Sequence, residues 1–244
     1  EVVIGEPRTE RIREAKNLKF VQMTWAGADI YTRGGFPQGT KIANASGAFG
    51  TIIAEYAIGS LVALYRSFGR YWSNKQAHIW QKYDHAETIS GKTALVLGMG
   101  DIGANVARRL KAFGAAVLGV KRTAVSAVPE DFEEAHTLDA LDALLPRADI
   151  VIGCLPNTRE TAGLLTAERL HAMKAGAVLI NVGRGSLAGT DDLVSALQDG
   201  HLGGAALDVF ETEPLPADCP LWDMENVLLT PHIAGPSFGG SADV

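Results

Sequence analysis

The run from residue 93 to residue 113 constrains the fold more than any other part of the chain. Thr93–Leu97 is mostly apolar and predicts a buried strand, and glycines follow as G-x-G-x-x-G at positions 98, 100 and 103. Residues 104–113 then predict a helix whose apolar face is Val106, Ala107, Leu110 and Phe113. A strand, a glycine turn and a helix N-terminus are the elements that hold a pyrophosphate. This run therefore favours a dinucleotide site over a merely structural glycine turn.

Strand and helix patterns alternate through the rest of the chain. Strands are predicted at 93–97, 116–120, near 135, at 150–154, 178–181 and 205–209, and in a short last segment at 228–229. Helices are predicted at 104–113, 138–145, 167–173 and 191–199, with Thr166 and Thr190 as N-caps. This alternation predicts an α/β protein with a doubly wound parallel sheet.

The first 81 residues predict a second, smaller α/β region and two connecting helices. A strand at 2–4, a helix at 9–16 and strands at 18–23 and 41–44 make up the α/β region. Residues 49–65 carry one charge, Glu55, and predict a helix that is buried on several sides by a second domain or a partner subunit. The aromatic stretch 69–81 predicts a further helix, and we expect Trp72 and Trp80 to pack in a core.

Charge and cysteine content exclude several functional classes. The net charge of −6 comes with no basic run, which argues against a nucleic-acid partner. Two cysteines, Cys154 and Cys219, give neither a disulfide framework nor a metal-ligand cluster, so we expect no metal and a reducing, cytoplasmic location. No apolar run has the length of a membrane helix. The first residue, Glu1, is not methionine and the last residues form no closing element, so we expect the sequence to be part of a longer chain.

The end of the second strand bears on the choice of nucleotide. An NAD site has an acidic residue about 20 positions past the glycines, which binds the ribose 2′-hydroxyl. Here the segment holds Lys121, Arg122 and Thr123. Two cations and a hydroxyl suit a 2′-phosphate, so the sequence favours NADP(H) over NAD(H). The alternative is that the basic pair is only solvent-exposed charge at the end of a strand.

Charged side chains follow the last three predicted strands. Arg184 lies between two glycines in N-V-G-R-G at 181–185, and Asp208, Glu211 and Glu213 lie in D-V-F-E-T-E-P-L at 208–215. His232 lies in T-P-H-I-A at 230–234. Each of these residues could be ordinary surface charge. Because the carboxyl ends of parallel strands meet at one edge, we expect all of them to face one crevice.

These motifs, in this order, closely resemble those of the D-isomer-specific 2-hydroxyacid dehydrogenases. W-A-G-A-D at 25–29 and the segment from Asn44 to Glu55 also resemble family segments, so the resemblance covers essentially the whole chain. It points to the NADP-preferring branch that includes glyoxylate/hydroxypyruvate reductases. It implies two Rossmann-like domains. A partial, flavodoxin-like substrate-binding domain would span 1–46, and a dinucleotide-binding domain with the interdomain helix would span 47–235. Residues 236–244 would start the return of the chain to the substrate-binding domain.

The resemblance also implies the catalytic roles. Arg184 would bind the carboxylate and carbonyl oxygen of a 2-oxo acid, and His232 would protonate that oxygen as hydride arrives. Glu213 would pair with His232, and a carboxylate beside an imidazole stabilises the protonated form that a proton donor needs. Glu211 is the competing carboxylate, but the family motif aligns Glu213.

The remaining site residues follow from the same resemblance. Asp208 would hold the nicotinamide carboxamide, and the backbone of Ala26 and Gly27 would bind the substrate carboxylate next to Trp25. The implied cofactor-binding set is Gly98, Met99, Gly100, Asp101, Ile102, Gly103, Lys121, Arg122, Thr123, Cys154, Leu155, Pro156, Val182, Gly183, Asp208 and His232.

The sequence leaves the substrate and the class of activity open. Trp25 and the lack of extra cations argue against a phosphorylated acid, and they leave glyoxylate, hydroxypyruvate or a bulkier 2-oxo acid. A homodimer is expected. The alternative to an enzyme is a nucleotide-sensing corepressor or scaffold of the same fold. Arg184, Glu213 and His232 are all present, which favours the enzyme.

Overall fold

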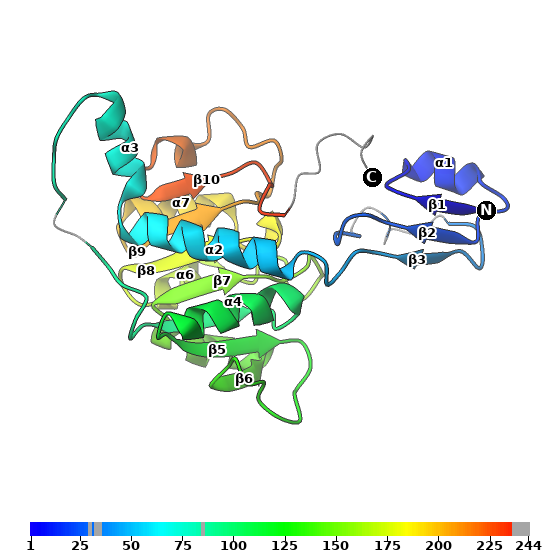
Figure 1. Cartoon of the computed structure of the whole chain (residues 1–244), viewed down its shortest axis with the longest axis horizontal. Coiled ribbons are helices and arrows are strands. Elements are labelled where there is room, and N and C mark those ends of the chain that lie inside the picture. Colours follow the sequence, from blue (N-terminus) through cyan, green and yellow to red (C-terminus); the bar gives the residue numbers. More distant parts are fainter. Residues whose placement is uncertain (29–30, 32–35, 84–85, 236–244) are drawn as a thin grey trace. The chain divides into compact units, whose positions relative to one another are not determined.

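The computed structural model describes residues 1–28, 31, 36–83 and 86–235, and it divides into two compact units (Figure 1). The first unit comprises Glu1–Phe49 and the second begins at Gly50. The predicted segment 236–244 lies outside the described residues. Among the helices that are described, none combines the length and the hydropathy needed to cross a membrane.

The first unit is a small parallel sheet covered by one helix. Strands β1 (Val2–Ile4), β2 (Phe20–Gln22) and β3 (Lys41–Ala43) pair in that order, and α1 (Thr9–Glu14) connects the first two. Its core consists of Ile12, Leu18, Val21, Met23 and Tyr31. Val2 and Ile4 are 66% and 73% exposed, so the core lies on one face of this sheet.

The second unit contains a seven-stranded parallel sheet in the order β10-β9-β8-β7-β4-β5-β6. Its strands are β4 (Thr93–Leu97), β5 (Ala116–Lys121), β6 (Glu134–Thr137), β7 (Ile150–Gly153), β8 (Ala177–Asn181), β9 (Leu202–Leu207) and β10 (Val227–Leu229). From β4 the chain winds outward through β5 and β6, then returns to β7 on the other side of β4. Such a reversal leaves a crevice at the carboxyl ends of β4 and β7, where doubly wound sheets bind ligands.

Helices cover both faces of this sheet (Figure 1). The long α2 (Gly50–Tyr65) and α4 (Asp101–Ala112) pack side by side on one face, while α6 (Ala167–Ala172) and α7 (Thr190–Gln198) lie on the other. The predicted helix at 138–145 is the short α5 (Leu141–Leu144) between two 3-10 turns, since Pro146 interrupts the helical hydrogen bonding. The sheet is thus doubly wound, as the strand pattern predicts.

The second unit covers one side of α2, and burial of the remaining surface by a partner subunit stays a prediction. Ile53, Ala54 and Leu61 are buried against the second unit, whereas Ile52 is 42% exposed and Glu55 pairs with Arg109 of α4 at 3.3 Å. In the single chain, this helix is therefore covered along one side.

The predictions for the aromatic segment after α2 were wrong. The helix α3 spans Phe68–Gln76 and ends before residue 81, because His78 adopts a left-handed backbone conformation with φ of 55°. Trp80 therefore lies beyond the helix and shares no helix face with Trp72. The side chains are 96% and 62% exposed, so neither packs in a core of this chain.

Two smaller expectations also need correction. Phe113 follows the last residue of α4 and is 50% exposed, so the buried face of that helix is Val106, Ala107 and Leu110. Thr190 is the first residue of α7 rather than its N-cap, which is Gly189, and the Thr190 N–H donates to the Glu211 carboxylate. Thr166 does cap α6, since its hydroxyl accepts a hydrogen bond from the Arg169 N–H.

Candidate active site

The glycine turn after β4 has the geometry that a pyrophosphate requires. Gly98 has φ of 107°, which favours glycine, and its N–H donates to the Val120 carbonyl at 2.8 Å. A Cβ on Gly103 would lie 1.8 Å from the Gly98 carbonyl oxygen, so only glycine lets α4 approach this closely. A Cβ on Gly100 would meet nothing within 4 Å, which leaves open space beside the first turn of α4. The N–H groups of that turn have no acceptor within the helix and are suited to phosphate oxygens.

The loops after β4, β7 and β8 meet at the reversal in strand order. The Cys154 N–H donates to the Leu97 carbonyl at 2.8 Å, and a Cβ on Gly98 would lie 2.9 Å from the Cys154 carbonyl oxygen. A Cβ on Gly183 would lie 2.6 Å from the Leu155 carbonyl oxygen. Burial raises the pKa of the Cys154 thiol to about 12, so this side chain stays neutral. The three loops form one closely packed wall of the crevice.

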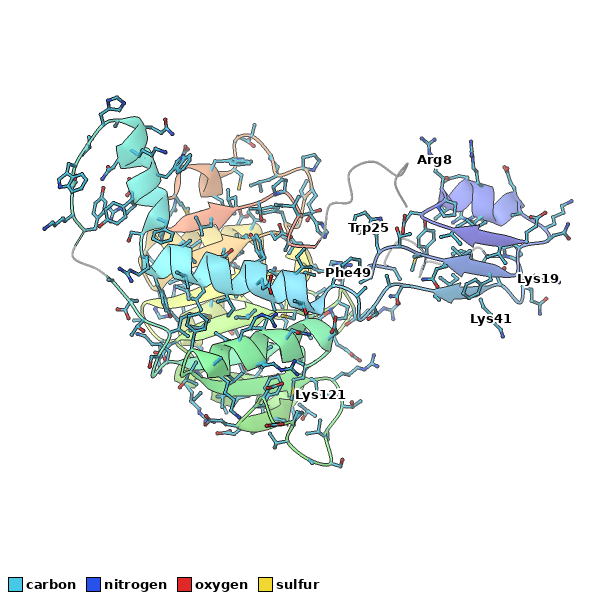
Figure 2. All side chains as sticks on the ribbon, viewed as in Figure 1. Arg8, Lys19, Trp25, Lys41, Phe49 and Lys121 are labelled. Atoms are coloured by element: carbon cyan, nitrogen blue, oxygen red, sulfur yellow. The ribbon has the colours of Figure 1, made fainter. Side chains whose placement is uncertain are left out.

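The basic pair lies at the carboxyl end of β5. Lys121 is the last residue of this strand (Figure 2), and Arg122 and Thr123 follow as exposed residues. Neither cation forms an ion pair with any residue that the structure describes. Both charges are thus available to an anion at this edge of the sheet.

Asp208 holds the loop that carries His232. It is 1% exposed, and its carboxylate accepts hydrogen bonds from the Thr230 hydroxyl at 2.6 Å and from the N–H groups of Ile233 and Ala234 at 2.8 and 2.9 Å. The Tyr56 hydroxyl lies 2.6 Å from that of Thr230, and burial raises the pKa of Tyr56. A buried carboxylate with three donors fixes the loop backbone strongly.

His232 and Glu213 form a contact between the loops after β10 and β9. His232 Nδ1 lies 2.9 Å from Glu213 Oε2, and Glu213 Oε1 accepts the Phe210 N–H at 3.0 Å. The His232 backbone has φ of 56°, and its N–H donates to the Asp208 carbonyl at 2.8 Å. Because Nδ1 is used, Nε2 is the ring nitrogen left for a substrate, and it bonds to no described residue. The pair can hold a proton at Nε2 and deliver it.

Glu211, the competing carboxylate, is engaged elsewhere. Its Oε2 accepts the Thr190 N–H at the start of α7. Of the two glutamates in this loop, the structure thus brings only Glu213 to the imidazole.

Arg184 lies on a tightly held loop after β8. The Asn181 side-chain amide donates to the Arg184 carbonyl at 2.9 Å, and Arg184 Nη1 donates to the Gly183 carbonyl at 2.8 Å. A Cβ on Gly185 would lie 1.9 Å from the Phe210 carbonyl carbon, so this loop packs directly against the loop that carries Glu213. The guanidinium and the His232–Glu213 pair are carried by neighbouring loops at one edge of the sheet.

Comparison with known proteins identifies the family. Residues 58–234 match the family described as D-isomer specific 2-hydroxyacid dehydrogenase, NAD binding domain. The chain belongs to this family. It is therefore an NAD(P)-binding oxidoreductase of the 2-hydroxyacid dehydrogenase type.

Individual relatives include enzymes with different substrates. The glyoxylate reductase of Thermofilum pendens is 36% identical over 90% of this chain, which spans 66% of that protein. The D-3-phosphoglycerate dehydrogenase of Mycobacterium leprae is also 36% identical over 92% of this chain, which spans 42% of that protein. The structure of an NADPH-dependent glyoxylate/hydroxypyruvate reductase from Sinorhizobium meliloti in complex with NADP and sulfate is 31% identical, with a TM-score of 0.85. That comparison covers 96% of this chain and 76% of the other.

In the first unit, the predicted substrate loop follows β2. Trp25 is 43% exposed and its ring stacks against that of Phe49, with centroids 6.5 Å apart (Figure 2). The Asn44 side chain donates to the Ala26 carbonyl at 2.7 Å. Asp29, the last residue of the W-A-G-A-D motif, lies outside the described residues.

Sequence reasoning missed two kinds of residue around the dehydrogenase site. Tyr56 and Thr230 complete the Asp208 network, and only the position of Thr230 inside T-P-H-I-A could have indicated this. A cleft of about 490 Å³ also opens beside the His232–Glu213 pair, lined by Phe210, Pro214, Leu215, Trp222, Leu229 and Pro231. The apolar character of these loop residues was visible in the sequence, but their convergence was not.

Proposed function

We propose that this chain reduces short, unphosphorylated 2-oxo acids to D-2-hydroxy acids with NADPH, and that His232 donates the proton to the carbonyl oxygen. The observation that carries this proposal is the 2.9 Å contact between His232 Nδ1 and Glu213 Oε2. The carboxylate orients the ring through Nδ1, which leaves Nε2 as the proton donor.

The dinucleotide-binding role belongs to the second unit. The turn from Gly98 to Gly103 would hold the pyrophosphate, with Met99, Asp101 and Ile102 around it. Cys154, Leu155, Pro156, Val182 and Gly183 would line the cofactor, and His232 would close the site. The bound nicotinamide supplies the hydride. Asp208 would have to combine its hydrogen bonds to the 230–234 loop with a contact to the carboxamide.

The preference for NADPH rests on Lys121 and Arg122. Two cations and the Thr123 hydroxyl at the end of β5 would bind the ribose 2′-phosphate. The carboxylate that binds the ribose 2′-hydroxyl in an NAD site is missing from these positions. The NADP found in the Sinorhizobium meliloti structure supports this preference.

The substrate would be bound by its carboxylate. In the second unit, Arg184 can form paired hydrogen bonds to a carboxylate and its neighbouring carbonyl oxygen. In the first unit, the amides of Ala26 and Gly27 would bind a substrate carboxylate. The named relatives act on different acids at equal identity, so similarity does not select the substrate. Trp25 supports a small acid such as glyoxylate or hydroxypyruvate, with a bulkier 2-oxo acid as the alternative.

The assembly would be a homodimer in which the first unit binds substrate and the second binds the dinucleotide. Exposed aromatic side chains on and after α3, namely Phe68, Trp72 and Trp80, support a protein partner at this segment. Sedimentation equilibrium tests this state, and a monomer at micromolar concentration would contradict it.

The direct test of the function is the decrease in NADPH absorbance with glyoxylate, hydroxypyruvate and phosphohydroxypyruvate offered in parallel. We expect turnover of one of the first two acids and at least ~10-fold lower kcat/KM for the phosphorylated acid. Preferred turnover of the phosphorylated acid would overturn the substrate assignment.

A further inference from the structure

Glu6 binds the backbone of the loop that follows β2. It lies two residues after the end of β1, the strand that pairs with β2, which precedes the loop. Its Oε1 accepts hydrogen bonds from the Thr24 N–H at 2.7 Å, the Thr24 hydroxyl at 2.8 Å and the Trp25 N–H at 3.2 Å. Three donors thus converge on one oxygen of an exposed carboxylate, and bonds to a charged acceptor are the stronger kind.

The same loop is held from its other side by the residues after β3. The Ala45 N–H donates to the Trp25 carbonyl at 3.0 Å, and the Asn44 side chain donates to the Ala26 carbonyl at 2.7 Å. The backbone between residues 24 and 26 is therefore fixed from the ends of both neighbouring strands.

Among the described residues, these contacts leave two consecutive amides without an acceptor. Glu6 takes the N–H groups of Thr24 and Trp25, while the N–H groups of Ala26 and Gly27 donate to no residue in the described part of the chain. Residues 24–26 form a bend, and successive backbone N–H groups in a turn can form a concave site for an anion. Because the loop is already ordered, it would lose little conformational freedom when an anion binds.

We infer that Glu6 is a positioning residue that fixes the Thr24–Trp25 backbone so that the Ala26 and Gly27 amides bind the carboxylate of the substrate. This inference rests on the proposed function for the identity of the anion. Glu6 itself touches neither substrate nor cofactor. Its effect is on the affinity for the carboxylate rather than on proton or hydride transfer.

The test compares Glu6→Ala with Glu6→Gln, which keeps an oxygen acceptor, and with Glu14→Ala, which removes an exposed glutamate at the end of α1 in the same unit. Oxamate, a carboxylate analogue of a 2-oxo acid, is titrated into each protein with NADPH present, and the amide resonances of Ala26 and Gly27 are followed by NMR. The KM and kcat for glyoxylate are measured in parallel.

We expect oxamate to shift both amides in the parent protein. Glu6→Ala should weaken oxamate binding and raise KM by about tenfold, with kcat and NADPH affinity changed less than about twofold. Glu6→Gln should restore most of the affinity, and Glu14→Ala should match the parent. Equal oxamate affinity in Glu6→Ala, or no shift of the two amides in the parent, would overturn the inference. Because oxamate binding is read without turnover, failure of the proposed reaction would be seen separately in the kinetics.

Discussion

His232 and Glu213 are 19 residues apart in the chain, yet their side chains meet at 2.9 Å, because the loops after β9 and β10 end at the same edge of the parallel sheet. Asp208 holds the backbone that positions His232 for this contact. It binds the loop on both sides of His232 through Thr230, Ile233 and Ala234. The imidazole is thus attached to a backbone that a buried carboxylate holds in place.

Replacing His232 with alanine should lower kcat for 2-oxo acid reduction by at least ~100-fold, the usual contribution of a general acid. NADPH affinity should change little, because the glycine turn and the basic pair are untouched. Steady-state kinetics with fluorescence titration of NADPH measure both quantities. A kcat near that of the parent would remove His232 from the mechanism.

Glu213 and Glu211 offer a matched pair of substitutions within one loop. Glu213→Gln should lower kcat by about 10- to 100-fold, since the carboxylate that orients the His232 ring is replaced by a neutral amide. Glu211→Gln removes the carboxylate that accepts the Thr190 N–H and should leave kcat within about twofold. If both variants lost activity equally, the 2.9 Å contact would not be the cause.

The cofactor preference should move when the cations after β5 are changed. Lys121→Asp with Arg122→Ala should lower the ratio of kcat/KM for NADPH to that for NADH by at least ~10-fold, because the 2′-phosphate loses its counter-charges. Arg108→Ala is the control, since it removes an exposed cation of α4 that pairs with Asp131. An unchanged ratio in the double variant would show that the 2′-phosphate binds elsewhere.

The pair formed by His171 and Asp199 should make stability depend on pH. His171 Nε2 lies 2.8 Å from Asp199 Oδ2, and this hydrogen bond raises the pKa of His171 and lowers that of Asp199. The stabilisation from His171 is present below its ordinary pKa of about 6.5 and is lost as pH rises through the raised value. The stabilisation from Asp199 is present above about pH 4 and is lost as pH falls through its lowered value.

The Tm of the parent protein and of His171→Gln, measured at about pH 5.5 and about pH 8.5, tests this dependence. The Tm of the parent should exceed that of the variant by more at the lower pH, because the stabilisation from protonated His171 is fully present there. Asp199→Asn should reduce the same difference. A larger difference at the higher pH would contradict the assigned pKa directions.

The strands and the glycine turn could be predicted from the sequence because they depend on local patterns. Thr93–Leu97 is apolar after its first residue, and Gly98 tolerates the positive φ that the turn requires. The exposure of Trp72 and Trp80 could not be predicted, because it depends on where α3 ends, and His78 is not a residue that usually ends a helix. The Asp208 network was also missed, since its three bonds join residues 22 to 26 positions apart.

NADPH oxidation by the parent chain in the presence of glyoxylate or hydroxypyruvate measures the proposed reaction directly. We predict turnover that requires the 2-oxo acid, is faster with NADPH than with NADH, and is lost in His232→Ala. A folded chain that binds NADPH but oxidises it with none of these acids would contradict the account and would favour a nucleotide-sensing role for the same fold.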